Sequence, residues 1–265
     1  MSNDNLVTLS AEPLRLDAPG MVRRLGLIAL STDLTSERDF ASLVPQEKIA
    51  VHTARIAFDN PTTPQALRNM QPGLTRAADL ILPGIPLDAI CYSCTAASVV
   101  IGDEAVAGAI NAARPGVPVV TPTGAARAAF RALGVRRISI LTPYLIETSQ
   151  PMAAYFSNHG LDVIRLECLG MEDDREMARV SRQTIVNAAL AVDSFEAEAL
   201  FISCTALPAL GVVKEMEARI GKPVVTSNQA SLWAMLCHAG QGGKTKGYGE
   251  LFRHALPGKG IGDSE

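Results

Sequence analysis

The sequence predicts an α/β protein built from two parallel-sheet halves that repeat one another, with a functional site in the cleft between them. Short apolar runs alternate with helical patterns along the chain, which is typical of parallel sheets covered by helices. The segment Ser-Cys-Thr-Ala occurs twice, at residues 93–96 and 203–206. Each copy follows a short apolar run, so each cysteine is predicted at the end of a strand, where a turn opens a helix.

The first half carries one full set of strands and helices. Ser31-Thr32-Asp33 follows the first apolar run and offers caps for a helix. A predicted turn separates the second strand from a longer helical pattern, at Asn60-Pro61-Thr62-Thr63-Pro64. The predicted elements are a strand at 23–30, a helix from 36, a strand at 50–56, a helix at 65–81, a strand at 87–92, a helix at 96–113, a strand at 116–121 and a helix at 124–133.

The second half repeats this order. Cys94 follows Ile28 by 66 residues, and Cys204 follows Ile140 by 64, so two landmarks recur at matching spacing. Gly-Val-Pro-Val-Val-Thr at 116–121 also returns as Gly-Lys-Pro-Val-Val-Thr. The predicted elements are a strand at 136–142, a helix at 152–159, a strand at 162–166, a helix at 181–191, a strand at 199–202 and a strand at 221–226.

An internal duplication with pseudo-two-fold symmetry is therefore predicted, with corresponding strand ends facing each other. The expected division is a poorly anchored lead-in at 1–20, a first α/β domain at 21–123 plus 228–265, and a second at 124–227. Because ligands of open α/β sheets bind beyond the carboxyl ends of the strands, the cleft between the domains is the expected site.

Composition excludes several classes of function. The chain has 265 residues, 48% of them hydrophobic, and a formal net charge of −3, which gives no electrostatic support for binding nucleic acid. No apolar run approaches the roughly 18–20 residues that span a bilayer, and no basic stretch leads into an apolar one near the N-terminus. With five cysteines and no disulfide-scaffold spacing, the sequence favours the cytoplasm.

The duplication separates the cysteines by function. Cys91 and Cys94 form Cys-x-x-Cys, which is also found in redox and metal sites. However, Phe201 stands where the repeat would place a partner of Cys91, so Cys91 is predicted to be a core residue, and no histidine nearby completes a metal site. Cys168 and Cys237 occur singly in apolar contexts and are predicted to be small buried residues.

Cys94 and Cys204 are the predicted catalytic pair. A thiol at the start of a helix lies near unpaired backbone N–H groups, which favour the thiolate and lower the thiol pKa. The same N–H groups, with Thr95 and Thr205 beside them, are expected to hold a substrate carboxylate. Two opposed thiols supply a base and an acid for moving a proton beside a carboxylate, or for isomerising a conjugated double bond, without cofactor or metal.

These residues resemble the aspartate/glutamate racemase superfamily, in the branch of maleate cis–trans isomerases and arylmalonate decarboxylases. Other segments are similar to the subgroup associated with ectoine utilisation, namely 99–103, 172–176 and 226–230. The segments that carry the main resemblance are Gly26-Leu27-Ile28 through Ser31-Thr32-Asp33, Tyr92-Ser93-Cys94-Thr95, Leu141-Thr142-Pro143-Tyr144, Ser203-Cys204-Thr205 and Pro223-Val224-Val225-Thr226.

The resemblance implies two flavodoxin-like domains, a cofactor-free cleft, a homo-oligomer and a small carboxylate substrate. It assigns catalysis to Cys94 and Cys204 and a substrate contact to Tyr144. Arylmalonate decarboxylases have a cysteine only at the second position, so the presence of both favours an isomerase or racemase. A decarboxylase and a binding protein without catalysis are the alternatives.

The resemblance also indicates where the substrate differs. Maleate isomerases bind substrate carboxylates with two asparagines, and the matching positions here are Asp33 and Asp173. A buried carboxylate facing a substrate carboxylate is repulsive, so a substrate that also carries a cationic nitrogen is expected, such as an amino acid or a cyclic amidine like ectoine. The alternative for Asp33 is that it only caps the following helix.

Overall fold

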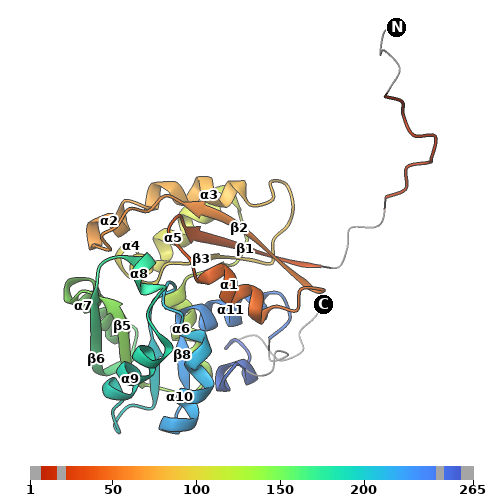
Figure 1. Cartoon of the computed structure of the whole chain (residues 1–265). Helices are drawn as coiled ribbons and strands as arrows, with labels where there is room; N and C mark the ends of the chain where they lie inside the picture. The colour runs from red at the N-terminus through yellow and green to blue at the C-terminus, as the bar shows by residue number, and fades with distance from the viewer. Residues whose placement is uncertain (1–6, 17–21, 243–247, 258–265) are drawn as a thin grey trace.

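The protein, described by a computed structural model over residues 7–16, 22–242 and 248–257, contains two parallel four-stranded sheets (Figure 1). The strand orders are β2-β1-β3-β4 and β6-β5-β7-β8, so the second sheet repeats the topology of the first. The predicted α/β class with two duplicated sheets is therefore confirmed.

The first sheet and its helices span the first half of the chain. Its elements are β1 Arg23–Leu30, α1 Ser36–Leu43, β2 Ile49–Ile56, α2 Pro64–Arg68, η1 Gln71–Gly73, α3 Leu74–Leu80, β3 Ala89–Tyr92, α4 Thr95–Ile101, α5 Asp103–Ala113, β4 Val119–Val120 and α6 Pro122–Ala132. The helix predicted at 65–81 is interrupted around Pro72, which lacks the N–H of a regular helix. The helix predicted at 96–113 breaks at Gly102, whose φ of 93° lies in the left-handed region.

The second sheet follows with the same order of strands. Its elements are β5 Arg137–Tyr144, α7 Ile146–Asn158, β6 Asp162–Met171, α8 Asp174–Met177, α9 Arg182–Val192, β7 Ala199–Ile202, η2 Leu210–Val212, α10 Val213–Ile220, β8 Val224–Thr226, α11 Ser227–His238 and η3 Glu250–Arg253. The helix predicted at 152–159 begins earlier, at Ile146, and the strand predicted at 162–166 continues to Met171. Both sheets pair in parallel throughout.

Two helices cross between the halves. Helix α6 follows the first sheet, but its Phe130 packs edge-on against Phe201 of β7, with ring centroids 6.0 Å apart. Helix α11 follows the second sheet, but Asn228 in its first turn reaches Asp39 of α1. The two crossing helices pack against each other between the sheets (Figure 1). Such an exchange agrees with the expected division near residues 124 and 228, which stays a prediction.

The repeated Val-Val-Thr segments start these two helices in the same way. Thr121 accepts a 3.1 Å hydrogen bond from the N–H of Gly124, and Thr226 accepts one of 3.2 Å from the N–H of Gln229. The side-chain oxygen of Gln229 in turn accepts a 3.0 Å hydrogen bond from the N–H of Thr226, which completes a capping box. The duplication therefore extends to the hydrogen bonds that begin corresponding helices.

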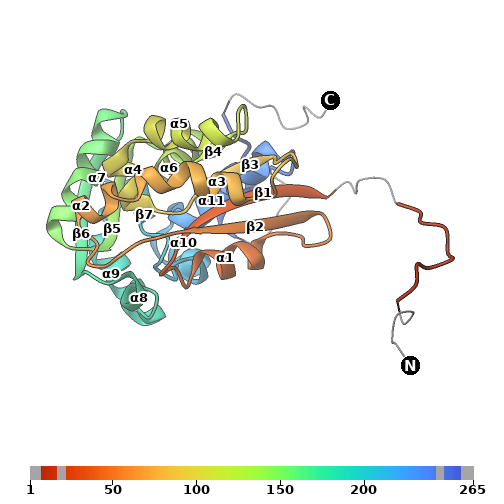
Figure 2. The same cartoon turned by 90° about the horizontal axis from the view of Figure 1, so that it is seen from above.

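The described part of the expected lead-in, residues 7–16, extends away from the two sheets with its side chains exposed (Figure 2). Residues 1–6 and 17–20 of that segment lie outside the described residues. Among the described helices no single one is long and apolar enough to cross a membrane. The helix pair α4 and α5 meets the length and composition together, and it is bent by 96°.

Candidate active site

Cys94 and Cys204 line the same narrow cavity at the carboxyl ends of β3 and β7. Both thiols are buried, with 7% and 5% of the residue exposed. The cavity volume is about 20 Å³, which is room for about one water molecule, so the site is shut in this conformation. The residues that line it are Leu30, Asp33, Phe58, Thr62, Leu67, Cys94, Ala96, Tyr144, Asp174, Met177, Cys204, Thr205 and Ala206.

Burial reverses the expected direction of the thiol pKa values. The sequence predicts a lowered pKa because each cysteine starts a helix or turn. In the structure, loss of solvent raises the pKa of Cys204 to about 11 and raises that of Cys94 further, although backbone N–H groups act in the lowering direction. Desolvation therefore outweighs the helix start, and each thiolate needs a further positive partner to form readily.

The two thiols are not equivalent. Cys204 receives hydrogen bonds from the Tyr144 hydroxyl and from the backbone of Ala206 and Leu207, all of which lower its pKa, whereas Cys94 has one backbone partner, Ala97, beside its side-chain contact with Tyr92. Cys204 also holds a φ of 93°, a strained value for a residue with a side chain. Cys204 is therefore the thiol that ionises more readily, and its strained turn aims it at the donors.

Hydrogen bonds join the two cysteine turns directly. The Thr205 hydroxyl donates to the backbone carbonyl of Ser93 at 3.0 Å. The hydroxyl oxygen of Ser227 accepts from the Thr95 hydroxyl at 2.8 Å and from the N–H of Cys204 at 3.0 Å. Thr205 lines the cavity, whereas the Thr95 hydroxyl is turned toward Ser227, so its proposed contact with a substrate has no geometric support.

Asp33 is one of two acids against the cavity, and it also caps a helix. Its carboxylate accepts from the N–H of Thr35 at 2.7 Å and from the N–H and hydroxyl of Ser36 at 2.9 and 2.5 Å. Burial raises the pKa of Asp33, while these hydrogen bonds act in the opposite direction. The capping alternative raised by the sequence is therefore present in the structure, beside a position that faces the cavity.

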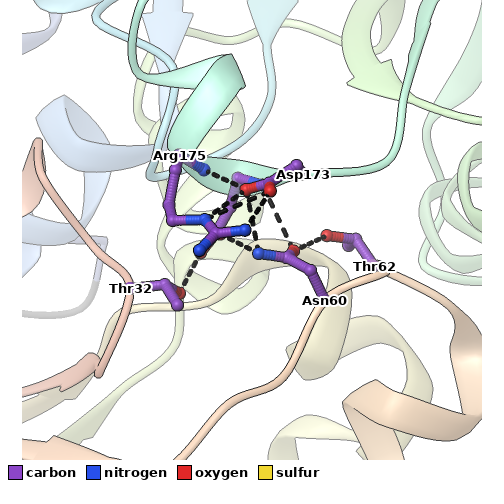
Figure 3. A network of polar contacts seen from close by, with 6 residues as sticks. Thr32, Asn60, Thr62, Asp173 and Arg175 are labelled. Atoms are coloured by element: carbon purple, nitrogen blue, oxygen red, sulfur yellow. Dashed lines mark hydrogen bonds and ion pairs between the residues drawn. The ribbon is translucent and has the colours of Figure 1, made fainter.

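The second acid is Asp174 rather than the predicted Asp173. Asp174 is buried and lines the cavity, where its carboxylate accepts hydrogen bonds from the Thr32 hydroxyl and, at 2.9 Å, from the side chain of Asn60. Asp173 instead caps α8 and pairs with Arg175, which lowers the pKa of Asp173 to about 2 (Figure 3). The sequence placed the acid one residue early because adjacent aspartates are indistinguishable without the turn that orients them.

Hydrogen bonds between the loop after β2 and residues 172–174 also connect the two halves next to the cavity. Asn60, in the loop after β2, donates to both Asp173 and Asp174 at 2.9 Å. The N–H of Thr62 donates to the carbonyl of Glu172 at 2.8 Å. The Thr62 hydroxyl also donates to the side-chain oxygen of Asn60 at 3.3 Å (Figure 3). Segments more than a hundred residues apart in sequence therefore meet over the site.

A second buried network lies behind Cys204. The side-chain amide of Asn228 donates to Asp39 and to the backbone carbonyl of Thr205, both at 2.9 Å. Burial raises the pKa of Asp39 to about 6. Asp39, Asn60 and Ser227 were not identified from the sequence as residues of the site. The sequence could have indicated Ser227, because this residue directly follows the second copy of the repeated Val-Val-Thr segment.

The charge of the cavity is one-sided. Among the described residues, its lining contains two carboxyl groups and two thiols, and no arginine, lysine or histidine. Within the described residues, no group of three or more histidine, cysteine, aspartate or glutamate side chains is arranged to hold a metal ion. The fold and site together define a two-lobed α/β protein with one cysteine from each lobe facing a shared, acidic cavity.

Comparison with known proteins places this class in a family. A profile of the arylmalonate decarboxylase family matches residues 93–252, and the chain belongs to that family. The arylmalonate decarboxylase of Bordetella bronchiseptica is 37% identical over 142 residues, a match that covers 52% of this chain and 58% of that relative. The maleate isomerase of Nocardia farcinica is 26% identical over 226 residues, which covers 81% and 89% of the two chains.

Solved structures agree with this placement. A mutant of the Nocardia farcinica maleate cis–trans isomerase with a covalently bound succinylcysteine intermediate matches with a TM-score of 0.81 at 25% identity, over 88% of this chain and 98% of that one. A liganded double mutant of arylmalonate decarboxylase matches with a TM-score of 0.79 at 27% identity, over 87% and 99%. The branch expected from the sequence motifs is thus confirmed; the ectoine-utilisation subgroup stays a prediction.

Proposed function

We propose that this protein is a cofactor-independent isomerase or racemase that acts beside the carboxylate of a small acid, with Cys94 and Cys204 as the reacting pair. One observation carries the proposal: two thiols from corresponding strand ends share a cavity that no basic side chain lines. Relatives named as maleate isomerases and an arylmalonate decarboxylase support chemistry at a carbon beside a carboxylate.

The two thiols divide the work of moving a proton. Cys204, the more readily ionised, takes the proton from the carbon next to the carboxylate as a thiolate. Cys94 gives its own proton to the opposite face of that carbon, and the configuration inverts. On a conjugated double bond, the thiolate instead adds to one carbon, the remaining single bond rotates, and loss of the thiolate restores the double bond. Both routes conserve atoms and electrons without an added cofactor.

The substrate carries a cationic nitrogen beside its carboxylate. A dianion such as maleate would meet the carboxyl groups of Asp33 and Asp174 in a cavity whose described lining residues include no cation. An ammonium or amidinium group would instead pair with these acids and, by its charge, lower the pKa of the buried thiols. Amino acids and cyclic amidines such as ectoine fit this requirement, and a role in ectoine catabolism is the corresponding proposal.

The substrate carboxylate would lie against the backbone N–H groups of the two cysteine turns. Thr205 and Tyr144, which line the cavity beside Cys204, are the proposed side-chain contacts. Asp33 remains a proposed contact, Asp174 takes the place expected for Asp173, and Thr95 is proposed to support the turn through Ser227. A homo-oligomer is proposed on the resemblance alone, and a cytoplasmic location on the number and spacing of the cysteines.

Decarboxylation is the second candidate function. It is favoured by the 37% identity to an arylmalonate decarboxylase. In that reaction loss of carbon dioxide leaves a carbanion, and one cysteine suffices to protonate it. The second cysteine of this chain therefore favours the isomerase or racemase. A protein that only binds a small acid is the remaining alternative.

Deuterated water separates these functions. Candidate amino acids, amidines and plain dicarboxylates are incubated with the wild type, Cys94→Ser and Cys204→Ser, and followed by NMR and mass spectrometry. Deuterium entering beside the carboxylate, or a cis–trans change, that is lost in both variants supports the proposal. Release of carbon dioxide that survives in Cys94→Ser would establish decarboxylation instead. Binding without any exchange would leave only the binding protein.

A further inference from the structure

A basic hollow lies away from the cysteine cavity, where the ends of α6 and α7 meet the turn into β5. Its volume is about 430 Å³, within the usual range for small-molecule sites. It shares no lining residue with the cysteine cavity. The residues that line it are Arg127, Arg131, Gly134, Val135, Arg136, His159, Gly160 and Leu161, and none is acidic.

Two guanidinium groups in this hollow have no carboxylate partner among the described residues. Arg131 and Arg136 are exposed, and no ion pair or side-chain hydrogen bond engages either. The contrast with the next residue is direct, because Arg137 pairs with Glu198 at 3.0 Å. Glu198 also accepts from the backbone N–H of Arg136 at 2.8 Å and attracts the Arg136 guanidinium electrostatically, but forms no direct ion pair with it.

The remaining basic groups are held in place from behind. Arg127 donates to the Tyr155 hydroxyl at 3.2 Å and lies 3.5 Å from Asp103. The Nδ1 atom of His159 lies 2.6 Å from the carbonyl oxygen of Tyr155, and the rings of these two residues are in contact, tilted by 40° with centroids 4.4 Å apart. Their partners therefore fix Arg127 and His159 at the wall, while Arg131 and Arg136 have side chains available for a ligand.

Compensation of helix dipoles explains only part of this cluster. Arg131 lies in the last turn of α6 and His159 caps the C-terminus of α7, where positive charge is favourable. Arg136 lies in no helix, yet it adds a third guanidinium to the same hollow. Asp103 and Glu198 act on Arg127 and Arg136 from outside the hollow, but its described lining holds three guanidinium groups and no carboxylate, which favours a counter-charge from a bound ligand.

We propose that this hollow is a second binding site, for a small polyanion that carries at least two phosphoryl or carboxylate groups. Guanidinium groups bind both kinds of group with paired, charge-assisted hydrogen bonds. The cysteine cavity, with two carboxyl groups and no cation, disfavours the same ligand, so binding at the two sites is separable. The proposal does not depend on the function proposed for the cysteines.

Calorimetric titration with inorganic pyrophosphate tests the site, and citrate in a parallel arm distinguishes phosphoryl from carboxylate recognition. The variant is Arg131→Gln/Arg136→Gln. The matched control is Arg68→Gln/Arg76→Gln, which removes two charges from exposed arginines on α2 and α3. The wild type and the control should bind with equal affinity, and the hollow variant at least about tenfold more weakly, the loss expected for one charge-assisted contact. Binding should weaken with added sodium chloride.

Absence of binding to the wild type, or equal affinity in both double variants, would overturn the proposal. Should the hollow variant fail to fold, the ring signals of His159 provide a readout in the wild type. The chain has four histidines, and His159→Gln assigns the signal. Pyrophosphate should shift the His159 resonance and leave that of His52 unchanged; an unshifted His159 would contradict the site.

Discussion

The side-chain hydroxyl of Thr205 donates a 3.0 Å hydrogen bond to the backbone carbonyl of Ser93, which joins the turn that carries Cys204 to the turn that carries Cys94. Both residues are buried, so the bond is shielded from water. Because each turn ends a strand of a different sheet, this contact sets how the two halves of the site face each other.

Removing that bond should impair activity more than stability alone explains. Thr205→Val leaves the Ser93 carbonyl buried without its partner, at a cost of about 1–3 kcal/mol, and lets the turns separate. We expect turnover to fall at least about tenfold for each 1.4 kcal/mol of lost transition-state stabilisation. Thr75→Val, which removes a 2.7 Å bond to the carbonyl of Ala109 far from the cavity, is the control. Equal activity of the two variants would contradict this role.

Asp174 should decide affinity for a cationic nitrogen. Asp174→Asn keeps the shape and a hydrogen-bond acceptor for Asn60 but removes the charge. An amine-bearing acid should bind about tenfold or more weakly, whereas a plain dicarboxylate should bind no worse. Asp173→Asn, the same change one residue away at the Arg175 pair, should alter neither affinity. Competition binding measures both, and equal losses in the two variants would refute the assignment.

The thiols should differ in reactivity without substrate. Burial raises the pKa of Cys204 to about 11 and the pKa of Cys94 further, so at neutral pH both are almost wholly protonated. Partly exposed Cys168 should react first with iodoacetamide, then Cys204, and Cys94 last. Peptide mass spectrometry over time gives the order. Faster labelling of Cys94 than of Cys204 would reverse our assignment of the base.

Asp39 should make stability fall as pH rises through the weakly acidic range. Its folded pKa of about 6 lies above the unfolded value of 3.8, so the folded state binds the proton more tightly. The loss of folding stability caused by ionising Asp39 is absent below pH about 3.8 and grows between pH about 3.8 and about 6. Above pH about 6 it is complete, at about 3 kcal/mol. Asp39→Asn retains an acceptor for Asn228 and should lose this part of the pH dependence. Urea unfolding of both proteins at pH 4 and 7 measures the difference.

The hydrogen bonds from Asn60 to Asp173 and Asp174 should control access to the cavity. The cavity has a volume of about 20 Å³ and admits no small acid until the segment around Asp174 moves. Asn60→Ala removes the amide that holds Asp173 and Asp174, and should increase hydrogen exchange in residues 172–177. Asn69→Ala, at the exposed residue that follows α2, removes a side-chain contact with Gln65 and serves as the control. Unchanged exchange in Asn60→Ala would show that other contacts hold the segment.

The sequence by itself determined the duplication, the two parallel sheets and the pairing of Cys94 with Cys204. These follow from local patterns: apolar runs, repeated turn residues and equal spacing in the two halves. The repeat also predicted that Cys91 is a core residue and not a catalytic one, and the burial of Cys91 within β3 agrees with a core position.

Only the tertiary structure decided the environment of the site. Burial raised the thiol pKa values that a helix start alone would lower, because desolvation depends on what packs above the turn. The orientation of one short turn placed Asp174, not Asp173, against the cavity. Asn60 and Ser227 joined the site through contacts between segments distant in sequence, which no local pattern encodes.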